Sequence, residues 1–270
     1  MKITDIRQNP NYANYMKTKS WTVVEKDGVY YYIKKILFFA LMKVQRPEEI
    51  RYKDIEILRK KYKILQIFLE PNTFKEADRL IKKNWKIAFP FVPSKTIFVN
   101  LDRPEKKIYE QMTKDTRYSI RKVQSSKLKI KNCEDFIKFR KSWKAAVDFK
   151  RYVLSVKDMQ DLKKSFGKDS LFILAENGSA GGIFLRAKDT GYYWYGFVSK
   201  FGRKNLSQYQ VVWEGIKWAK KRGAKYLDME GIFDERFPIP AWRGFTHFKK
   251  GFGGKIKKFP GAYKKMFLPF

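Results

Sequence analysis

Cations and aromatic rings alternate in the carboxy-terminal segment from Pro240 to Phe270, which contains no acidic residue. Cations bind phosphate groups, and the faces of aromatic rings stack on bases or sugars. The glycines of the segment allow backbone N–H groups to approach a ligand closely. We therefore interpret the segment as an anion-binding functional surface. Its cations are Arg243, Lys249, Lys250, Lys255, Lys257, Lys258, Lys264 and Lys265.

The charge of the whole chain also indicates an anionic partner. The 270 residues include 60 Lys and Arg against 27 Asp and Glu, which gives a formal net charge of +33. Self-repulsion on that scale is unfavourable for a compact monomer. Nucleic acid, an anionic membrane face and a phosphorylated substrate all qualify as partners, and charge alone does not separate them. A solvated lysine-rich surface explains part of the excess.

The chain offers little for metal or disulfide chemistry. Cys133 is the one cysteine and His247 the one histidine, which excludes a disulfide framework, a thiolate cluster and a multi-histidine metal site. We predict no metal site. Because Phe245 and Phe248 flank it in the sequence, His247 is predicted to be a buried, hydrogen-bonded imidazole.

The apolar stretches are short. The most apolar one, Ile36–Met42, is too short to span a bilayer and is predicted to be a buried strand. We find no signal peptide, since no small-residue cleavage site follows an apolar run. The sequence therefore predicts a cytoplasmic protein.

The elements that must position these residues follow the same order in both halves of the chain: a hairpin, a third strand, a helix and a further strand. In the first half we predict these elements at Thr22–Glu25, Val29–Ile33, Phe38–Val44, Pro47–Lys61 and Ile64–Leu69. In the second half we predict them at Leu171–Ala175, Gly182–Ala187, Tyr192–Val198, Ser207–Arg222 and Lys225–Met229. A long basic helix from Pro104 to Gln124 is predicted between the halves.

This order is that of the GNAT acyltransferase fold, present twice. We predict an α/β (α+β) protein with two tandem GNAT-like domains, at residues 1–130 and 131–256, the first completed by residues 257–270. In an enzyme that uses acetyl-CoA, a glycine-rich loop before the long helix holds the pyrophosphate. Here that loop, Gly202–Gln208, has one glycine where two are needed. The acyl donor is therefore predicted not to be acetyl-CoA.

Seven short motifs are spread over nearly the whole chain. They are Ser20-Trp21, Glu70-Pro71, Asp102–Pro104, Thr116–Lys122, Tyr226–Ile232, Gly244–Gly254 and Pro260–Tyr263. In these motifs the chain resembles the FemABX family of non-ribosomal peptidyltransferases. The block near the carboxy terminus is the most specific part of the resemblance.

The resemblance implies transfer of an amino acid from aminoacyl-tRNA to the stem-peptide amine of a peptidoglycan precursor, either UDP-MurNAc-pentapeptide or lipid II. Aminoacyl-tRNA is then a co-substrate, and no cofactor is implied. The inner membrane face is a further anionic surface for peripheral contact. Some family members carry a helical arm, and this chain has no matching heptad insertion.

The resemblance also implies catalytic residues. Phe248-Lys249 matches a Phe-Lys pair that lies by the reaction centre. Lys249 is expected at the developing oxyanion and the tRNA 3′ end, and Phe248 is expected to stack on adenine or to pack against substrate. Glu70 is expected to accept the proton of the amine or to orient it. A solvated lysine and a carboxylate in a surface ion pair are the alternative interpretations of Lys249 and Glu70.

Binding residues follow from the same comparison and from the local pattern. Tyr193 and Tyr195 alternate with Trp194 along one strand, so they are predicted to share a face, with core packing as the alternative. We predict that the precursor is bound by Trp21, Lys26, Lys150, Arg151, Tyr152, Tyr193 and Tyr195. We predict that tRNA is bound by Arg117, Arg121, Lys122, Lys250 and Lys255.

Asp228 and Glu230 stand two residues apart on a predicted strand, which places both on one face. Paired carboxylates suit a general base, and a structural anchor for the following turn is an equal alternative.

Three rival functions remain open. One is an RNA-binding protein of the same fold without catalysis. Another is a GNAT-type acyltransferase with a different donor or acceptor. The third is a membrane-surface protein held by its basic face.

Overall fold

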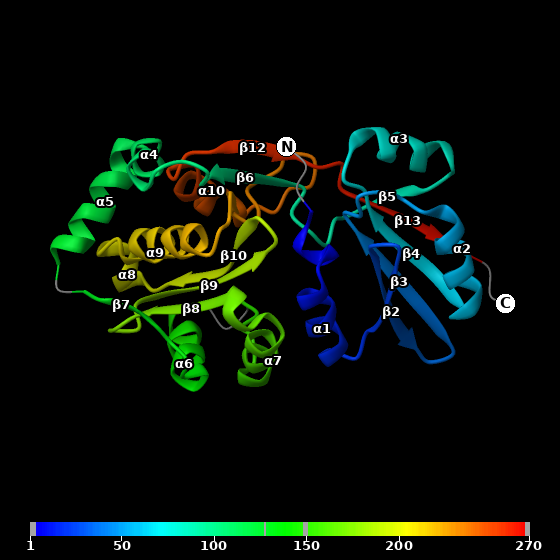
Figure 1. The fold of residues 1–270 in the computed structure, drawn as a ribbon, viewed down its shortest axis with the longest axis horizontal. Coiled ribbons are helices and arrows are strands. Elements are labelled where there is room, and N and C mark those ends of the chain that lie inside the picture. Colours follow the sequence, from blue (N-terminus) through cyan, green and yellow to red (C-terminus); the bar gives the residue numbers. More distant parts are fainter. Residues whose placement is uncertain (1–3, 127, 148–150, 268–270) are drawn as a thin grey trace. The chain divides into compact units, whose positions relative to one another are not determined.

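The computed structural model describes residues 4–126, 128–147 and 151–267 of the chain (Figure 1). Its internal contacts divide the chain into two compact units. Unit 1 comprises residues 1–95, 233–239 and 257–270, and unit 2 comprises residues 96–232 and 240–256. Residues 96–130 therefore group with the second unit, whereas the sequence analysis assigned them to the first.

Unit 1 is built on a six-stranded sheet in the order β1-β2-β3-β4-β13-β5. Strand β3 pairs with β4 in parallel, and the other pairs of neighbours are antiparallel. The strands are β1 (Thr22–Lys26), β2 (Val29–Ile36), β3 (Phe39–Gln45), β4 (Ile64–Glu70), β5 (Lys86–Ala88) and β13 (Ala262–Met266). The helices are η1 (Ile6–Gln8), α1 (Pro10–Thr18), α2 (Tyr52–Lys61) and α3 (Phe74–Lys82).

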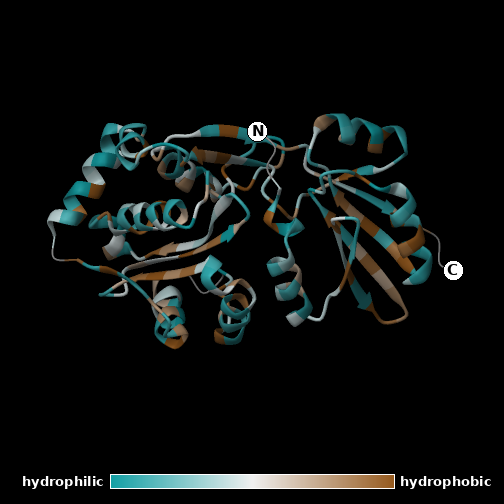
Figure 2. Cartoon of the chain, in the orientation of Figure 1, coloured by the Kyte–Doolittle hydropathy of each residue, from teal (hydrophilic) through white to brown (hydrophobic). Residues whose placement is uncertain are grey.

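Strand alternation explains why both faces of the unit 1 sheet are covered. Tyr31 and Ile33 of β2 point into a core that includes Leu58 of α2 and Leu80 of α3. Tyr32, between them, meets Tyr12 of α1 with ring centroids 5.7 Å apart. Figure 1 shows α1 and α2 on opposite faces of this sheet. Figure 2 shows hydrophobic stretches in the strands of this sheet, interrupted by hydrophilic residues.

Unit 2 is built on a seven-stranded sheet in the order β12-β6-β11-β10-β9-β8-β7. The strands are β6 (Lys95–Asn100), β7 (Ile130–Asn132), β8 (Ser170–Ala175), β9 (Ala180–Ala187), β10 (Thr190–Val198), β11 (Tyr226–Asp228) and β12 (Lys255–Lys258). The helices are α4 (Glu105–Glu110), α5 (Lys114–Ser125), α6 (Phe136–Ala146), α7 (Val156–Phe166), η2 (Gly167–Asp169), α8 (Lys200–Lys204), α9 (Ser207–Lys221) and α10 (Trp242–Lys250).

Helix α9 packs its apolar side on one face of this sheet, and α6 and α7 lie on the other (Figure 1). Val211 and Ile216 of α9 join Phe184 of β9 in one core. Gly215 allows this close approach, because a Cβ atom there would lie 2.1 Å from the Phe184 ring. On the opposite face, Phe139 and Trp143 of α6 pack against the Phe197 ring of β10.

The predicted order of elements is confirmed in both units, as β1-β2-β3-α2-β4 and as β8-β9-β10-α9-β11, with the short helix α8 inserted before α9. Helix α2 begins at Tyr52, five residues after the predicted start at Pro47. The predicted long basic helix is two helices, since α4 ends at Glu110 and Thr113 caps α5 through a bond from the Thr116 amide. The prediction of one buried strand over Ile36–Met42 is wrong, because residues 36–38 are exposed at the turn between β2 and β3.

Candidate active site

A buried lysine marks the site in unit 2. Lys249, in the last turn of α10, is only 8% exposed. Its Nζ atom donates hydrogen bonds to three consecutive backbone carbonyls, those of Met229 at 2.5 Å, Glu230 at 3.2 Å and Gly231 at 2.8 Å. An ammonium group has three N–H donors, so each of them has a carbonyl partner.

The backbone after β11 explains why three carbonyls converge on one cation. Strand β11 ends at Asp228, and Glu230 and Gly231 follow with positive φ angles of 51° and 96°. Glycine adopts such angles readily, whereas a glutamate there is uncommon. The chain therefore curls around the ammonium. Aromatic rings cover the cation from other sides, with Nζ 4.8 Å from the centroid of Phe245 and 5.6 Å from that of Tyr193.

Burial lowers the pKa of Lys249 from its ordinary value of 10.5 to about 8, and the negative charges of Glu230 and Asp228 oppose this shift. The group is therefore mainly protonated at neutral pH, as three carbonyl acceptors require. The alternative of a solvated lysine is wrong. A hydrogen bond from Lys249 to a developing oxyanion would have to replace one of its carbonyl contacts.

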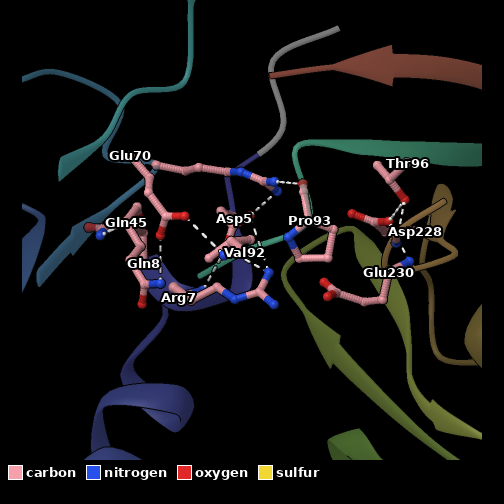
Figure 3. Close-up of polar contacts among 12 residues, drawn as sticks. Asp5, Arg7, Gln8, Gln45, Glu70, Val92, Pro93, Thr96, Asp228 and Glu230 are labelled. Carbon is pink, nitrogen blue, oxygen red and sulfur yellow. Dashed lines mark hydrogen bonds and ion pairs between the residues drawn. The ribbon is translucent and has the colours of Figure 1, made fainter. Parts of the chain in front are cut away.

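The Asp228 side chain holds the same turn, residues 229–231, through hydrogen bonds. Its Oδ1 atom accepts a hydrogen bond from the Thr96 hydroxyl and another, at 2.8 Å, from the backbone N–H of Glu230 (Figure 3). The Asp228 side chain is buried, with 1% exposure. These contacts support the interpretation of Asp228 as a turn anchor.

Phe248 turns the other way from its neighbour on α10. Its ring lies 4.9 Å from that of Tyr209 on α9 and 5.3 Å from that of Phe252. It is half-buried, so it packs on the core of unit 2. The prediction that His247 is a buried imidazole is wrong, because its side chain is exposed.

Several glycines and aromatic rings of the carboxy-terminal segment pack inside the protein and do not form its surface. Gly253 and Gly254 have φ angles of 77° and 96°, and a Cβ atom at either would lie within 2.6 Å of a backbone oxygen. Phe252, Phe259 and Tyr263 are buried. The interpretation of the whole segment as a binding surface is therefore too broad, and its exposed cations include Lys250 and Lys255.

Tyr193 and Tyr195 do not share a face, which corrects the prediction. A bulge in β10 sets Tyr193 opposite Phe184 and Tyr195 opposite the adjacent residue Ile183. Tyr193 is buried on the α9 side, where its hydroxyl contacts the Gln208 amide. Tyr195 instead packs against Trp143, on α6, at 5.3 Å. Only Tyr193 is brought to Lys249.

Glu70 lies at the end of β4 in unit 1 and is 3% exposed. Its Oε1 atom accepts from the backbone N–H groups of Phe91 at 2.8 Å and Val92 at 2.9 Å, and its Oε2 atom accepts from the Gln45 amide at 2.7 Å. Burial raises its pKa, although these hydrogen bonds act in the opposite direction. The alternative of a surface ion pair is therefore wrong.

A buried ionic cluster beside Glu70 was missed by the sequence analysis (Figure 3). Arg46 pairs with Asp5 at 2.9 Å, donates to the Pro93 carbonyl, and stacks 3.5 Å from the Phe259 centroid. Burial opposes ionisation of Asp5, yet Arg7 and Arg46 together lower its pKa. The one signal in the sequence is a charged residue, Arg46, placed directly after the apolar strand β3.

The remaining precursor-binding candidates are scattered. Lys26 forms an ion pair with Asp54. Trp21 is half-buried, with Lys43 Nζ 4.9 Å from the centroid of its ring. Arg151 and Tyr152 are exposed in unit 2, and Lys150 lies outside the described residues.

Of the tRNA-binding candidates on α5, Arg121 and Lys122 are exposed. Arg117 is half-buried, because its guanidinium donates to the carbonyls of Glu110 and Met112 and so closes the end of α4. Lys122 lines a cavity of about 340 Å³ in unit 2. Its other lining residues are Ser126, Leu128, Asn177, Phe201 and Asn205.

The loop that would hold a pyrophosphate in an acetyl-CoA enzyme is partly helical here. Residues Lys200–Lys204 form α8, capped by the Ser199 hydroxyl. Gly202 serves packing, since a Cβ atom there would lie 2.4 Å from the Ser179 carbonyl oxygen. This loop is thus tied to the turn between β8 and β9.

Within the described ranges, no group of three or more His, Cys, Asp or Glu side chains is arranged to hold a metal ion. The same part of the chain contains no helix that is both long and apolar enough to cross a bilayer.

Comparison with known proteins supports the predicted resemblance. Residues 178–270 match the FemAB family. The fold is similar to that of FemX, with a TM-score of 0.81 at 14% identity over 99% of this chain and 97% of that one. It also resembles L-PGS from Bacillus licheniformis, with a TM-score of 0.60 at 11% identity over 97% and 94% of the two chains.

A tandem GNAT protein from the clavulanic acid biosynthesis pathway gives a TM-score of 0.54 at 8% identity, over 92% of this chain and 82% of that one. No protein of curated function matches at a significant level of sequence similarity. The predicted resemblance to FemABX proteins and the predicted tandem GNAT fold are thus confirmed.

Proposed function

Because residues 178–270 match the FemAB family and the fold is similar to that of FemX, we propose that this chain is an aminoacyl-tRNA-dependent aminoacyltransferase. The acceptor that we propose is the stem-peptide amine of a peptidoglycan precursor. The net charge of +33 fits two anionic substrates, a tRNA and a pyrophosphate-linked precursor.

The reaction asks little covalent chemistry of the protein. The amine nitrogen attacks the carbonyl carbon of the aminoacyl ester, a C–N bond forms, and the C–O bond to the ribose breaks. The amine loses a proton to a base, and the ribose oxygen takes one up. The protein has to align the two substrates and stabilise the negative charge that develops on the carbonyl oxygen.

One observation carries the proposal: a buried lysine lies within the segment that matches the family. Lys249 is held by three carbonyls and covered by two rings, so its position is fixed before any substrate binds. A preorganised charge in a poorly solvated place stabilises a developing anion more strongly than a solvated charge does.

In this proposal Lys249 acts in two ways. It fixes the backbone of residues 229–231, and it places a positive charge where the oxyanion develops. Phe248 holds α10 against α9 through Tyr209. Glu70 belongs to the scaffold of unit 1, because both of its carboxylate oxygens already accept hydrogen bonds. Its role as a proton acceptor stays a prediction that Glu70→Gln tests.

All three N–H donors of the Lys249 ammonium already have carbonyl partners. This observation favours one alternative, an RNA-binding protein without catalysis. If the lysine serves only to clamp the turn after β11, the fold and the basic surface remain useful for RNA binding alone.

The experiment that decides is a transfer assay. The purified chain is incubated with a mixture of charged, labelled tRNAs and either UDP-MurNAc-pentapeptide or lipid II, with uncharged tRNA as the control. We expect a precursor whose mass has grown by one amino-acid residue. Binding of tRNA without any extended precursor would leave the RNA-binding alternative standing and reject the enzyme.

A further inference from the structure

The turn between β2 and β3 in unit 1 exposes large apolar side chains. Leu37 is 91% exposed and Phe38 is 85% exposed, and Ile36 beside them is 53% exposed. Most large apolar residues of the described chain are buried or half-buried, and single exposed ones are normal. Three in succession at the tip of a hairpin form a contiguous apolar projection. We call residues 36–38 the apolar tip.

Folding does not require apolar residues at this position. Ile36 pairs with Phe39, so Leu37 and Phe38 form a two-residue turn, and Leu37 has a φ angle of 52°. Such turns favour glycine, asparagine or aspartate, because positive φ strains a bulky side chain. The side chain of Leu37 is therefore placed at some conformational cost and without any gain from burial.

Two other two-residue turns of the chain provide the contrast. Asp27-Gly28 joins β1 to β2, and Lys188-Asp189 joins β9 to β10. Their first residues also have positive φ, 49° for Asp27 and 53° for Lys188. Both turns are polar, as expected for turns that meet only water. The turn at Leu37 and Phe38 thus shares a positive φ angle at its first residue with both of these turns but has a different surface chemistry.

Lysines surround the apolar tip. Lys34 and Lys35 precede it on β2. Lys34 Nζ donates a hydrogen bond to the Lys19 carbonyl at 2.9 Å, so the residues that end α1 lie beside this part of β2. After the tip, the Ala40 N–H donates a hydrogen bond to the Lys63 carbonyl at 3.2 Å, so the turn that follows α2 lies beside the start of β3. The three neighbouring segments, residues 17–23, 33–41 and 59–65, contain no Asp or Glu.

We propose that the apolar tip inserts into the surface of an anionic lipid bilayer. Its three side chains would enter the boundary between headgroups and acyl chains, as apolar groups of peripheral proteins do. The surrounding lysines would remain at the level of the lipid phosphates, with their alkyl stems along the apolar region. RNA would engage the lysines and could stack a base on Phe38, but it gives no reason for the exposed aliphatic side chains of Ile36 and Leu37. An apolar protein groove gives no reason for the lysines.

Membrane contact also bears on the acceptor. If the proposed transfer is correct, a protein held at the bilayer by this tip meets a lipid-linked precursor more often than a soluble one. This step rests on the proposed function, whereas the membrane contact does not.

Vesicle binding tests the proposal. The full chain is mixed with vesicles of phosphatidylglycerol and phosphatidylcholine, and bound protein is measured by flotation. We expect the double variant Leu37→Ser/Phe38→Ser to bind at least about tenfold more weakly. The matched control is Phe201→Ser, which removes a ring that is 62% exposed in unit 2 and should leave binding unchanged.

Salt separates insertion from charge attraction. At high ionic strength the wild type should retain part of its vesicle binding, whereas the double variant should lose nearly all of it. A further variant, Leu37→Trp, should show a blue shift of indole fluorescence with vesicles.

The proposal is overturned if the wild type does not bind these vesicles, or if the double variant binds them as the wild type does. It is also overturned if the double substitution weakens tRNA binding and spares vesicle binding. The two proposals fail separately: transfer to a soluble precursor should be the same for the wild type and the double variant. Vesicle binding that persists without transfer would reject the proposed function alone.

Discussion

The two units repeat one arrangement of strands and helices, and equivalent positions in them have different chemistry. Each repeat ends its fourth strand with a buried acid, Glu70 on β4 and Asp228 on β11. Glu70 accepts hydrogen bonds from the backbone at residues 91 and 92. Asp228 accepts from Thr96 and from the backbone N–H of Glu230. In both units the acid therefore holds a loop.

The difference lies in what the held loop presents. In unit 2 the carbonyls after Asp228 bind the ammonium of Lys249. In unit 1 the Glu70 carboxylate accepts hydrogen bonds from the backbone of the loop at residues 91 and 92 and from the Gln45 amide. Both units thus place a buried acid at the end of the fourth strand, but the cation near that acid is bound differently. The carbonyls after β11 hold Lys249, whereas Arg46 beside Glu70 pairs with Asp5. We therefore assign the central charge of the proposed chemistry to unit 2.

The largest expected effect comes from removing that cation. Lys249→Met leaves three buried carbonyls without their shared donor, and we expect it to destabilise the fold by about 3 kcal/mol. The measurement is the free energy of unfolding in urea. Lys250→Met is the control, since Lys250 is exposed and its loss should cost less than about 0.5 kcal/mol. Equal stability of the two variants would contradict the clamp.

Removing the anchor of the first repeat should cost slightly less. Glu70→Ala deprives two backbone N–H groups and one side-chain amide of their acceptor, and we expect a loss of about 2 kcal/mol. Glu70→Gln, which keeps one acceptor oxygen, should cost about half as much and should leave the transfer rate within a few-fold of the wild type. A loss of transfer by about a hundredfold or more in Glu70→Gln would identify Glu70 as the base.

The pH dependence of stability separates Lys249 from the other titrating groups. The pKa of Lys249 is about 8 in the folded chain and near 10.5 in the unfolded chain. Between these values the unfolded chain binds more protons, so this group makes the folded chain more stable as pH rises. The difference in unfolding free energy between the wild type and Lys249→Met should therefore grow by roughly 2 kcal/mol from about pH 7.5 to about pH 9.5. A difference independent of pH would mean that burial does not shift this pKa.

The smallest effect concerns the equivalent turns of the two repeats. Leu37→Gly relieves a positive φ angle at an exposed site and should stabilise the fold by about 0.5 kcal/mol. Lys188→Gly, at the matching turn of unit 2, should do the same. The two variants should differ in vesicle binding, which only Leu37→Gly weakens. Similar losses of vesicle binding in both variants would contradict the assignment of membrane contact to the turn at Leu37.

The order of elements could be predicted from the sequence because apolar runs and turn residues mark each strand. Glu70 could be placed at a strand end for the same reason. The burial of Lys249 could not be predicted from composition, because it depends on carbonyls eighteen to twenty residues earlier in the chain. The interruption between α4 and α5 is also tertiary, since the Thr113 N–H bonds to the Gly251 carbonyl at 2.9 Å.

Two further differences have local causes that a sequence pattern does not reveal. The bulge at Trp194 changes which tyrosine faces α9, because one extra residue reverses the alternation. The apolar run through Ile36 and Leu37 was predicted to be a buried strand, because hydrophobicity alone does not distinguish a core strand from an exposed tip. Function, rather than folding, explains such exceptions best.

The most direct test of the account is single-turnover aminoacyl transfer by the wild type, Lys249→Met and Lys250→Met, compared at equal amounts of folded protein. At saturating tRNA, where a weaker contact from Lys250 does not limit the rate, we expect the wild type and Lys250→Met to transfer at similar rates. We expect a rate at least about a hundredfold lower for Lys249→Met, with tRNA affinity largely retained. Folded Lys249→Met that transfers as fast as the wild type would contradict the assignment of the central charge to Lys249.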